Sequence, residues 1–288
     1  MSYSPCGGGA YLRSDDYAAL DAVGQHRVLA QATATASGTG TAVSHASALA
    51  LHGIELWNVP LALVHMTANR THGGKKSRRR HLHATPFDPD EVTAVDGVLV
   101  TTVARSLVDF ARTVPFEQAV VSGDHALRLG CTDPAELAAA VARAHHRTGA
   151  RRARRAVAFT DGLSESAGES RSRVLLLRST LPIPELQQFV YGVDGRPVGR
   201  VDFLAGTRCR GRIRRDGQVR DEPGPHRARG APQGEVPRGR TATGTAVARW
   251  TWKHLDDPET VVARIRRAFE IAPRSAPFPC ASRPPGPV

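Results

Sequence analysis

Several stretches of the first 160 residues place apolar side chains at every third or fourth position, a spacing that predicts amphipathic helices. The Ser14–Asp16 segment consists of residue types that cap a helix start, and Gly53 is a typical C-terminal stop. Asp133 before Pro134 marks a further start, because proline is well tolerated at the first helical position. We expect helices over residues 14–36, 45–52, 102–112, 116–129, 133–145 and 151–159.

Short stretches between these helices are rich in strand-forming residues and are bounded by turn residues. Residues 61–67 and 81–84 are strand-like on either side of a basic loop at 75–80. Residues 92–100 predict a tight hairpin that turns at Asp96-Gly97. The N-terminal module is therefore expected to combine helices with a small, hairpin-rich sheet.

A helix and then a hairpin are predicted in the segment that follows. The helix carries the apolar run 174–177 and ends before Pro182, since proline cannot continue a helix. Two strands are expected, at 186–193 and 198–204, joined by a Val-Asp-Gly-Arg turn.

The second of these strands alternates in character along its length. Val201 and Phe203 point to one face, and Arg200 and Asp202 point to the other. Glu169 lies near the start of the preceding helix. A carboxylate on that helix and another on the strand can share one divalent cation, and two carboxylates are the minimum for metal-assisted phosphodiester cleavage.

Both carboxylates also have simpler interpretations. Glu169 can be a helix N-terminal acid favoured by the helix dipole. Asp202 can be a solvent-facing strand residue. From spacing alone these alternatives stay open.

The 288 residues are enough for one large or two ordinary domains with a sizeable core. A net charge of +12 and a pI of about 10.6 favour polyanionic partners. However, residues 205–245 hold ten arginines against four acids, which is half of that net charge. Basicity is therefore a weak argument for nucleic-acid binding by the rest of the chain.

Cysteine usage and hydropathy indicate a cytoplasmic protein. The four cysteines are far apart and form no CxxC pair, so we expect reduced thiols and neither a zinc site nor a disulfide framework. No apolar run approaches the roughly 20 residues of a membrane span, and the N-terminus lacks a signal-peptide pattern. No membrane partner is expected.

Two histidines and two basic runs among the first 160 residues favour structural roles. His45 and His52 are seven positions apart on one predicted helix face, but nothing nearby completes a metal set, so we expect core or capping roles. The basic runs 75–80 and 151–155 are typical of solvated faces.

Motifs in the second half resemble a known nuclease family. They are GESRSR at 168–173, ELQ at 185–187, GRVDF at 199–203 and AVARWTWKHL at 246–255. These look like parts of a Vsr/MutH-like nuclease domain of the PD-(D/E)XK superfamily. The resemblance implies that Glu169 and Asp202 are ancestral catalytic metal ligands and that Mg²⁺ is the cofactor.

Motifs in the first half resemble the AbiEi-like part of actinobacterial proteins that carry this nuclease-type domain at their C-terminus. They are GAYLRSDDYAAL at 9–20, AVSHASALALHG at 42–53 and VDGVLVTTVARSLVDFAR at 95–112. AbiEi-like proteins are antitoxin-like members of type IV toxin–antitoxin systems, so the resemblance implies DNA and a cognate toxin protein as partners. Such proteins usually carry a winged-helix segment upstream, and with GAYLR starting at Gly9 there is no room for a recognition helix, so either the true start codon lies further upstream or the helix–turn–helix is absent.

Residues 207–245 match neither part of the resemblance. Their only branched aliphatic residues are Ile213, Val219 and Val236, so the pattern predicts no strand or helix. The segment can be a disordered Arg/Gly/Pro insertion or an RGG-like nucleic-acid tail. A third interpretation, a pair of compensating frameshifts, explains more.

The frameshift hypothesis depends on back-translation. One permitted DNA sequence for residues 211–220, read one base later, encodes Gly-Glu-Phe-Asp-Gly-Thr-Val-Lys-Tyr, the acidic strand motif that the resembled family has at this place. The same shift at 233–239 permits the charged start of the family's following helix. The central strand's acid is then missing, Asp216 is a poor replacement because arginines surround it, and the domain is inactive as written.

We therefore expect an α+β protein: an N-terminal helical AbiEi-like module with a small β-hairpin sheet at 10–160, and an α/β restriction-endonuclease-like domain at 161–270. Residues 205–245 are expected to be disordered or frameshifted, and residues 271–288 to be a disordered tail. The expected function is that of a DNA-associated protein with a nuclease-like C-terminal domain that is inactive as written. The alternative is a non-catalytic antitoxin or transcriptional regulator of a type IV toxin–antitoxin system.

Overall fold

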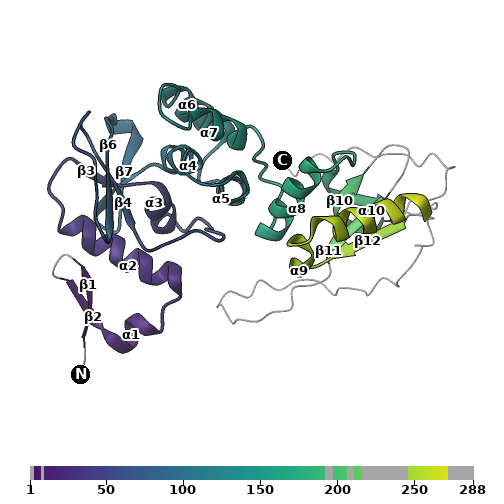
Figure 1. The fold of residues 1–288 in the computed structure, drawn as a ribbon, viewed down its shortest axis with the longest axis horizontal. Helices are drawn as coiled ribbons and strands as arrows, with labels where there is room; N and C mark the ends of the chain where they lie inside the picture. The colour runs from purple at the N-terminus through teal and green to yellow at the C-terminus, as the bar shows by residue number, and fades with distance from the viewer. Residues whose placement is uncertain (1–2, 8–9, 192–196, 206–210, 216–245, 272–288) are drawn as a thin grey trace. The chain divides into compact units, whose positions relative to one another are not determined.

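The computed structural model describes residues 3–7, 10–191, 197–205, 211–215 and 246–271 (Figure 1). Helices and mixed sheets make this an α+β protein, which confirms the predicted fold class. The chain divides into two units, Met1–Arg171 and Ser172–Val288, and the division falls inside helix α8 (Ala167–Arg178). The predicted boundary, between residues 160 and 161, lies in the loop before α8.

The first unit begins with an antiparallel hairpin and two helices, where the sequence predicted one helix. The Asp21 carboxylate accepts a 2.7 Å hydrogen bond from the Gly24 amide and thereby caps a new helix start. The predicted helix is therefore interrupted ahead of Asp21. The elements are β1 (Tyr3–Gly7), β2 (Ala10–Arg13), α1 (Ser14–Ala18) and α2 (Ala22–Thr35).

A six-stranded mixed sheet follows. Its strands are β3 (Thr41–Val43), β4 (Val64–Ala68), β5 (Lys75–Lys76), β6 (Arg80–Ala84), β7 (Val92–Val95) and β8 (Val98–Thr101). Their order is β5-β6-β4-β3-β8-β7, in which the β4–β6 and β3–β8 pairs are parallel. The predicted hairpin at 92–100 is confirmed, and Asp96 and Gly97 both have the positive φ that such a turn requires.

The remaining elements of this unit are helical. They are α3 (His45–Leu51), the short 3-10 helix η1 (Pro89–Glu91), α4 (Val103–Ala111), α5 (Phe116–Arg128), α6 (Pro134–Arg143) and α7 (Ala150–Val157). The predicted start at Asp133 is confirmed, because its carboxylate accepts a hydrogen bond from the Glu136 amide in the first turn of α6. Thr102 caps α4 in the same way. The cap predicted at Ser14–Asp16 is wrong, because these residues lie inside α1, whose N-cap is Arg13 and which has no side-chain cap hydrogen bond. Gly53 ends α3 at a φ of 74°.

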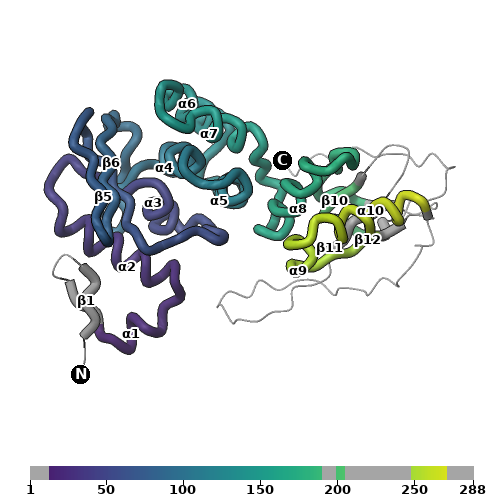
Figure 2. The backbone as a smooth tube through the Cα atoms, viewed as in Figure 1, coloured from purple at the N-terminus to yellow at the C-terminus, as the bar shows by residue number. Residues whose placement is uncertain are grey.

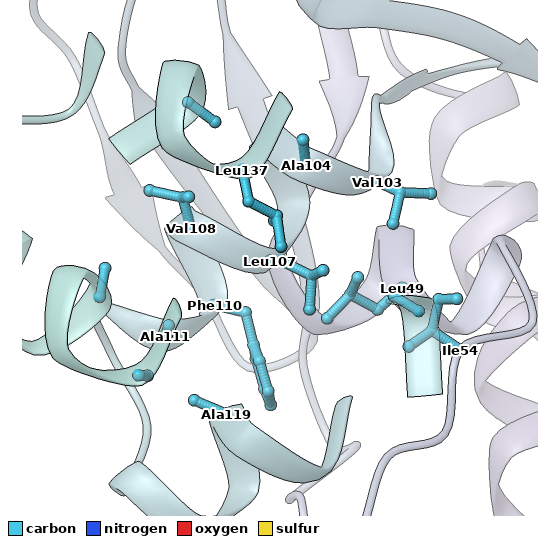
Figure 3. Packing of buried hydrophobic residues seen from close by; sticks show 14 of the residues in the cluster. Leu49, Ile54, Val103, Ala104, Leu107, Val108, Phe110, Ala111, Ala119 and Leu137 are labelled. Atoms are coloured by element: carbon cyan, nitrogen blue, oxygen red, sulfur yellow. The ribbon is translucent and has the colours of Figure 1, made fainter. Parts of the chain in front are cut away.

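Helix α3 contributes to two buried clusters. Leu51 packs with Val43 and Met66 of the sheet. Leu49 packs with Leu107 and other residues of the helical part (Figure 3). Each such side chain, when fully buried, contributes about 1.5–3 kcal/mol, so α3 is fixed from both sides.

The second unit contains a four-stranded mixed sheet and its helices. Its strands and its two later helices are β9 (Glu185–Tyr191), β10 (Pro197–Ala205), β11 (Gly211–Arg215), β12 (Ala246–Trp250), α9 (Trp252–Leu255) and α10 (Pro258–Ile271). The order is β12-β11-β10-β9; β10 is antiparallel to both neighbours, and β11 is parallel to β12. Helix α10 runs alongside β12 (Figure 2), and it also contacts β11.

The core of this unit joins its helices to the sheet. Leu176 of α8 and Ile265 of α10 are buried with Phe203 of β10 and Trp250 of β12. The Phe203 and Trp250 rings are stacked at a centroid distance of 6.0 Å, and Trp250 Nε1 donates a 2.9 Å hydrogen bond to Ser172 Oγ. Val201 and Phe203, which were predicted to share one face of this strand, are both buried.

Strand β11 corrects one sequence prediction. No strand was expected between 207 and 245, yet residues 211–215 pair with β10 on one side and with β12 on the other. A central strand is held by main-chain hydrogen bonds to both neighbours, so pairing can form without a clear side-chain period. The segment predicted to be disordered or frameshifted and the predicted disordered tail fall largely on residues 206–210, 216–245 and 272–288. These residues lie outside the described ones. The predicted turn at 193–196 lies outside them as well.

In the described part of the chain, no helix combines the length and the apolar character needed to cross a bilayer.

Candidate functional site

Glu169 lies in the first turn of α8 and is 4% exposed. Its Oε2 accepts a 3.0 Å hydrogen bond from the Glu165 amide, and its Oε1 accepts a 3.1 Å bond from the Ser166 hydroxyl. Ser166 Oγ in turn accepts a bond from the Glu169 amide. This reciprocal arrangement caps the start of α8, as the simpler interpretation of Glu169 expected.

Asp202 lies in the middle of β10, an interior strand of the second unit's sheet. It is half-buried, between the fully buried Val201 and Phe203. Since neighbouring strand residues alternate in direction, its carboxylate is on the face opposite these two side chains. The predicted alternation along this strand is confirmed.

Among the described residues, one set of three or more histidine, cysteine, aspartate or glutamate side chains is close enough to share a metal ion. It consists of His45, His65 and His83, and so it includes neither Glu169 nor Asp202. The assignment of those two carboxylates as metal ligands stays a prediction.

The three histidines come from three elements of the first unit. His45 begins α3, His65 is in β4, and His83 is in β6 (Figure 1). Their candidate ligand atoms all lie within 4.8 Å of one another, and His65 Nδ1 is 3.0 Å from His83 Nε2. The His45 and His83 rings are stacked with centroids 4.0 Å apart.

Burial keeps these imidazoles neutral. Desolvation lowers the pKa of His45 well below its usual value, that of His65 to about 4 and that of His83 to about 3. The neighbouring imidazole of His81 lowers the pKa of His65 and of His83 further. A neutral imidazole is the form that binds metal ions.

The expectation that nothing near His45 completes a metal set is therefore wrong, whereas the structural role expected of His52 is confirmed. His52 is not one of the three histidines of that set. Its Nε2 donates a 2.8 Å hydrogen bond to the Thr101 carbonyl oxygen. The sequence did contain a signal for the missed residues: His81 and His83 alternate on one strand, and His65 lies on the strand paired with it. Only the parallel β4–β6 pairing brings them to His45.

A buried ion network lies in the helical part of the same unit. The Arg105 guanidinium contacts Glu91 Oε1 at 2.8 Å and Asp109 Oδ2 at 2.6 Å. Arg112 and Arg147 contact the other Asp109 oxygen at 2.6 and 3.5 Å. Burial alone would raise the pKa of the Asp109 carboxyl, but the nearby His45 and the surrounding guanidinium groups hold it well below its usual range.

A pocket of about 600 Å³ opens beside this network. Its walls carry charges of both signs, with Arg105 and Arg143 facing Asp90, Glu91 and Glu136. Arg143 forms a bidentate ion pair with Asp90, in which Nη2 donates to Oδ2 at 2.6 Å and Nη1 donates to Oδ1 at 3.1 Å. The two arginines are thus paired with acids of the same wall, Arg105 with Glu91 and Arg143 with Asp90. Cys131, also in its wall, is a free, exposed thiol.

Two curated proteins of Mycobacterium tuberculosis are similar to part of the chain. They are named "Uncharacterized protein Rv2248" (strain ATCC 25618 / H37Rv) and "Uncharacterized protein MT2308" (strain CDC 1551 / Oshkosh), and each is 38% identical over 109 residues. That stretch is 38% of this chain, and the chain spans 40% of the length of each relative. No family model and no solved structure matches the chain.

Proposed function

We propose that this chain is a DNA-associated protein whose second unit has a nuclease-like fold without a complete catalytic metal site. The observation that carries the proposal is the sheet of that unit. Its elements follow one another in the order expected from the nuclease resemblance: helix α8, the antiparallel hairpin β9–β10, the third strand β11, and the late strand β12, which is parallel to β11. Asp202 lies on the polar face of this sheet.

The connection between β11 and β12 gives further support. Parallel strands require a crossover connection of a dozen or more residues, usually a helix. The segment available for it, residues 216–245, is where the resembled family has its second helix. This is also the segment to which the frameshift hypothesis applies.

The described carboxylates do not make a full magnesium set. Mg²⁺ favours octahedral coordination by oxygen atoms, and carboxylates of Asp and Glu suit it. Both Glu169 oxygens, however, already accept hydrogen bonds that cap α8, and in the part of the chain that the structure describes no third acidic ligand joins Asp202. We therefore propose no cleavage step for the chain as written.

A second candidate function is that of a non-catalytic antitoxin-type regulator of a type IV toxin–antitoxin system, which acts through the first unit on DNA or on a cognate toxin protein. The observation that favours it is the exposed face of α7. Its four arginines, unlike the buried alanines between them, face solvent and offer a positively charged surface: Arg151, Arg152, Arg154 and Arg155. Such a surface suits phosphate contacts.

The test uses the full chain and duplex DNA. We expect binding that weakens steeply with salt, as phosphate contacts do, and no Mg²⁺-dependent cleavage. The frame-restored chain, expressed after a one-base correction at each end of codons 205–246, is expected to gain cleavage. Asp202→Asn in the restored chain is the matched control and should abolish that cleavage.

Each outcome discriminates between the candidates. Mg²⁺-dependent cleavage by the chain as written, lost in Asp202→Asn, would overturn the claim of an incomplete site. Binding confined to one operator sequence, lost when the α7 arginines are replaced by alanine, would favour the regulator. Absence of DNA binding at low salt would contradict both DNA-directed functions.

A further inference from the structure

We propose that the first unit binds one Zn²⁺ ion, or a similar transition-metal ion, through His45, His65 and His83. This site is independent of the nuclease-like unit and of the proposed function. Imidazole is a preferred ligand of Zn²⁺, and three histidines with an open fourth position are an established type of zinc coordination.

The distances between the ligand atoms suit one ion. Four nitrogens held about 2.0–2.1 Å from a tetrahedral zinc lie roughly 3.3 Å from one another. His65 Nδ1 and His83 Nε2 are already 3.0 Å apart, and all three candidate nitrogens lie within 4.8 Å. Small side-chain rotations bring the third nitrogen to the required distance, and the ion replaces the hydrogen bond between His65 and His83.

A hydroxyl pair orients the buried ligand. His45 Nδ1 lies 3.0 Å from Ser44 Oγ, and Ser44 Oγ accepts a 2.8 Å hydrogen bond from Thr67 Oγ1. When Nδ1–H donates to Ser44, the other ring nitrogen of His45 carries the free electron pair. Metal-binding histidines commonly have such an outer partner, which fixes the tautomer and the ring orientation.

The backbone also favours a special role for His45. Its φ of 54° is in the left-handed region, which only a few per cent of non-glycine residues adopt, with asparagine, aspartate and histidine the most frequent among them. Residues held in this conformation are concentrated at sites that bind ligands. Here the conformation starts α3 while the ring stacks on His83.

Burial and charge set the character of the site. His45 is 4% exposed, whereas His65 and His83 are half-buried, so the ion has a protein-lined inner side and an outer side open to water. Three charged groups act on the cluster. Lys76 acts on His65. Asp109 and Arg112 act on both His45 and His83. The Asp109 carboxylate offsets Arg112, and the fourth position is left to water or to a ligand from solution.

The ion has a structural consequence. It joins the start of α3 to β4 and β6, in addition to the hydrogen bonds that already connect α3 with β4, such as the one from the His65 amide to Ser47 Oγ. Because a ligand that binds only the folded state raises its stability, Zn²⁺ is expected to raise the melting temperature of the first unit.

The intact chain is first treated with a chelator to remove metal ions. Zn²⁺ or Co²⁺ is then added with Mg²⁺ in excess, so that Mg²⁺ occupies sites made of oxygen ligands. The experiment measures the Zn²⁺ content and the absorption spectrum of bound Co²⁺. We expect one equivalent of Zn²⁺ per chain and a Co²⁺ spectrum typical of a tetrahedral site. His65→Ala and His83→Gln should weaken Zn²⁺ binding by more than the roughly 10- to 100-fold expected for loss of an outer partner. Ser44→Ala should fall in that 10- to 100-fold range.

His72→Ala is the matched control, since His72 is an exposed histidine of the same unit outside the set. It should bind Zn²⁺ as the wild type does. Circular dichroism without metal shows whether each variant folds, so that loss of binding in a folded variant is informative. The proposal is overturned if the wild type binds no Zn²⁺, or if His83→Gln and His72→Ala bind it equally well.

Discussion

Arg105 is 1% exposed and lies between two carboxylates, Glu91 and Asp109. Taking an arginine out of water is unfavourable unless partners compensate for the lost hydration. Here the partners come from η1 and from the same helix, so the side chain fixes the position of α4 relative to the turn before β7. Sequence patterns predicted α4 but gave no role to this arginine.

Replacement of Arg105 by methionine should leave Glu91 and Asp109 buried without their closest shared partner, although Asp109 keeps its contacts with Arg112 and Arg147. We expect a loss of about 3–5 kcal/mol in the free energy of unfolding, the usual effect of breaking a buried ion pair. Urea denaturation followed by circular dichroism measures it. Arg143→Met removes an exposed arginine that pairs with Asp90 and is expected to leave the urea midpoint unchanged. Equal effects of the two substitutions would contradict this account.

Asp109 predicts a pH dependence of stability. Its folded-state pKa is lower than the value of about 3.9 in an unfolded chain, so the unfolded state binds more protons at acid pH. The stabilisation is therefore fully present above about pH 5 and decreases as the pH falls below the unfolded-state value towards the folded one. In unfolding experiments from pH 7 to pH 3, Asp109→Asn should flatten this decrease, whereas Asp16→Asn at an exposed position should leave its slope as in the wild type.

At the scale of elements, most helices and hairpins could be predicted from the sequence because their signals are local. Apolar spacing, capping residues and the Asp96-Gly97 turn act within a few residues of one another. The two strands that were missed depended on pairing partners that their own residues do not reveal. Strand β11 forms because β10 and β12 flank it, and the lysines at 75–76 become a strand because β6 pairs with them.

Gly149 tests how α7 is joined to α4. Its φ is 83°, and a Cβ atom at this position would lie 2.4 Å from the Arg112 carbonyl oxygen. Gly149→Ala should therefore destabilise the protein by more than about 1 kcal/mol, through both backbone strain and a main-chain clash. Gly38→Ala is the control, because a Cβ there meets nothing within 4 Å. Thermal denaturation compares the two, and an equal melting temperature would refute the role given to Gly149.

Trp250 tests the core of the second unit. Trp250→Ala removes the ring that stacks on Phe203 and the hydrogen bond to Ser172, and we expect a loss of about 3–5 kcal/mol. In hydrogen exchange, peptides from β12 and α10 should lose protection while peptides from α4 keep theirs. Lys253→Ala, at an exposed position, should change neither. Loss of protection in α4 would show that the two units do not unfold separately.

At the scale of the whole molecule, the frameshift hypothesis makes a prediction about the gene. Sequencing across codons 200–250 should show codons that, one base later, encode Glu-Phe-Asp-Gly at residues 211–220. Two single-base changes, one near codons 204–209 and one near 243–247, should separate this frame from the flanking one. If the codons do not permit that motif, the segment is a basic insertion, and nucleic-acid binding through its arginines becomes the better explanation.

The sequence by itself determined the α+β class, the order of most elements and the alternation that puts Asp202 opposite Val201 and Phe203. These features depend on neighbours a few residues away, whose spacing is visible in the chain. The tertiary structure alone decided that His45 meets His65 and His83, and that β11 completes a sheet with β12. Both results depend on which strands pair, and pairing is fixed by burial and main-chain hydrogen bonds between segments that are distant in sequence.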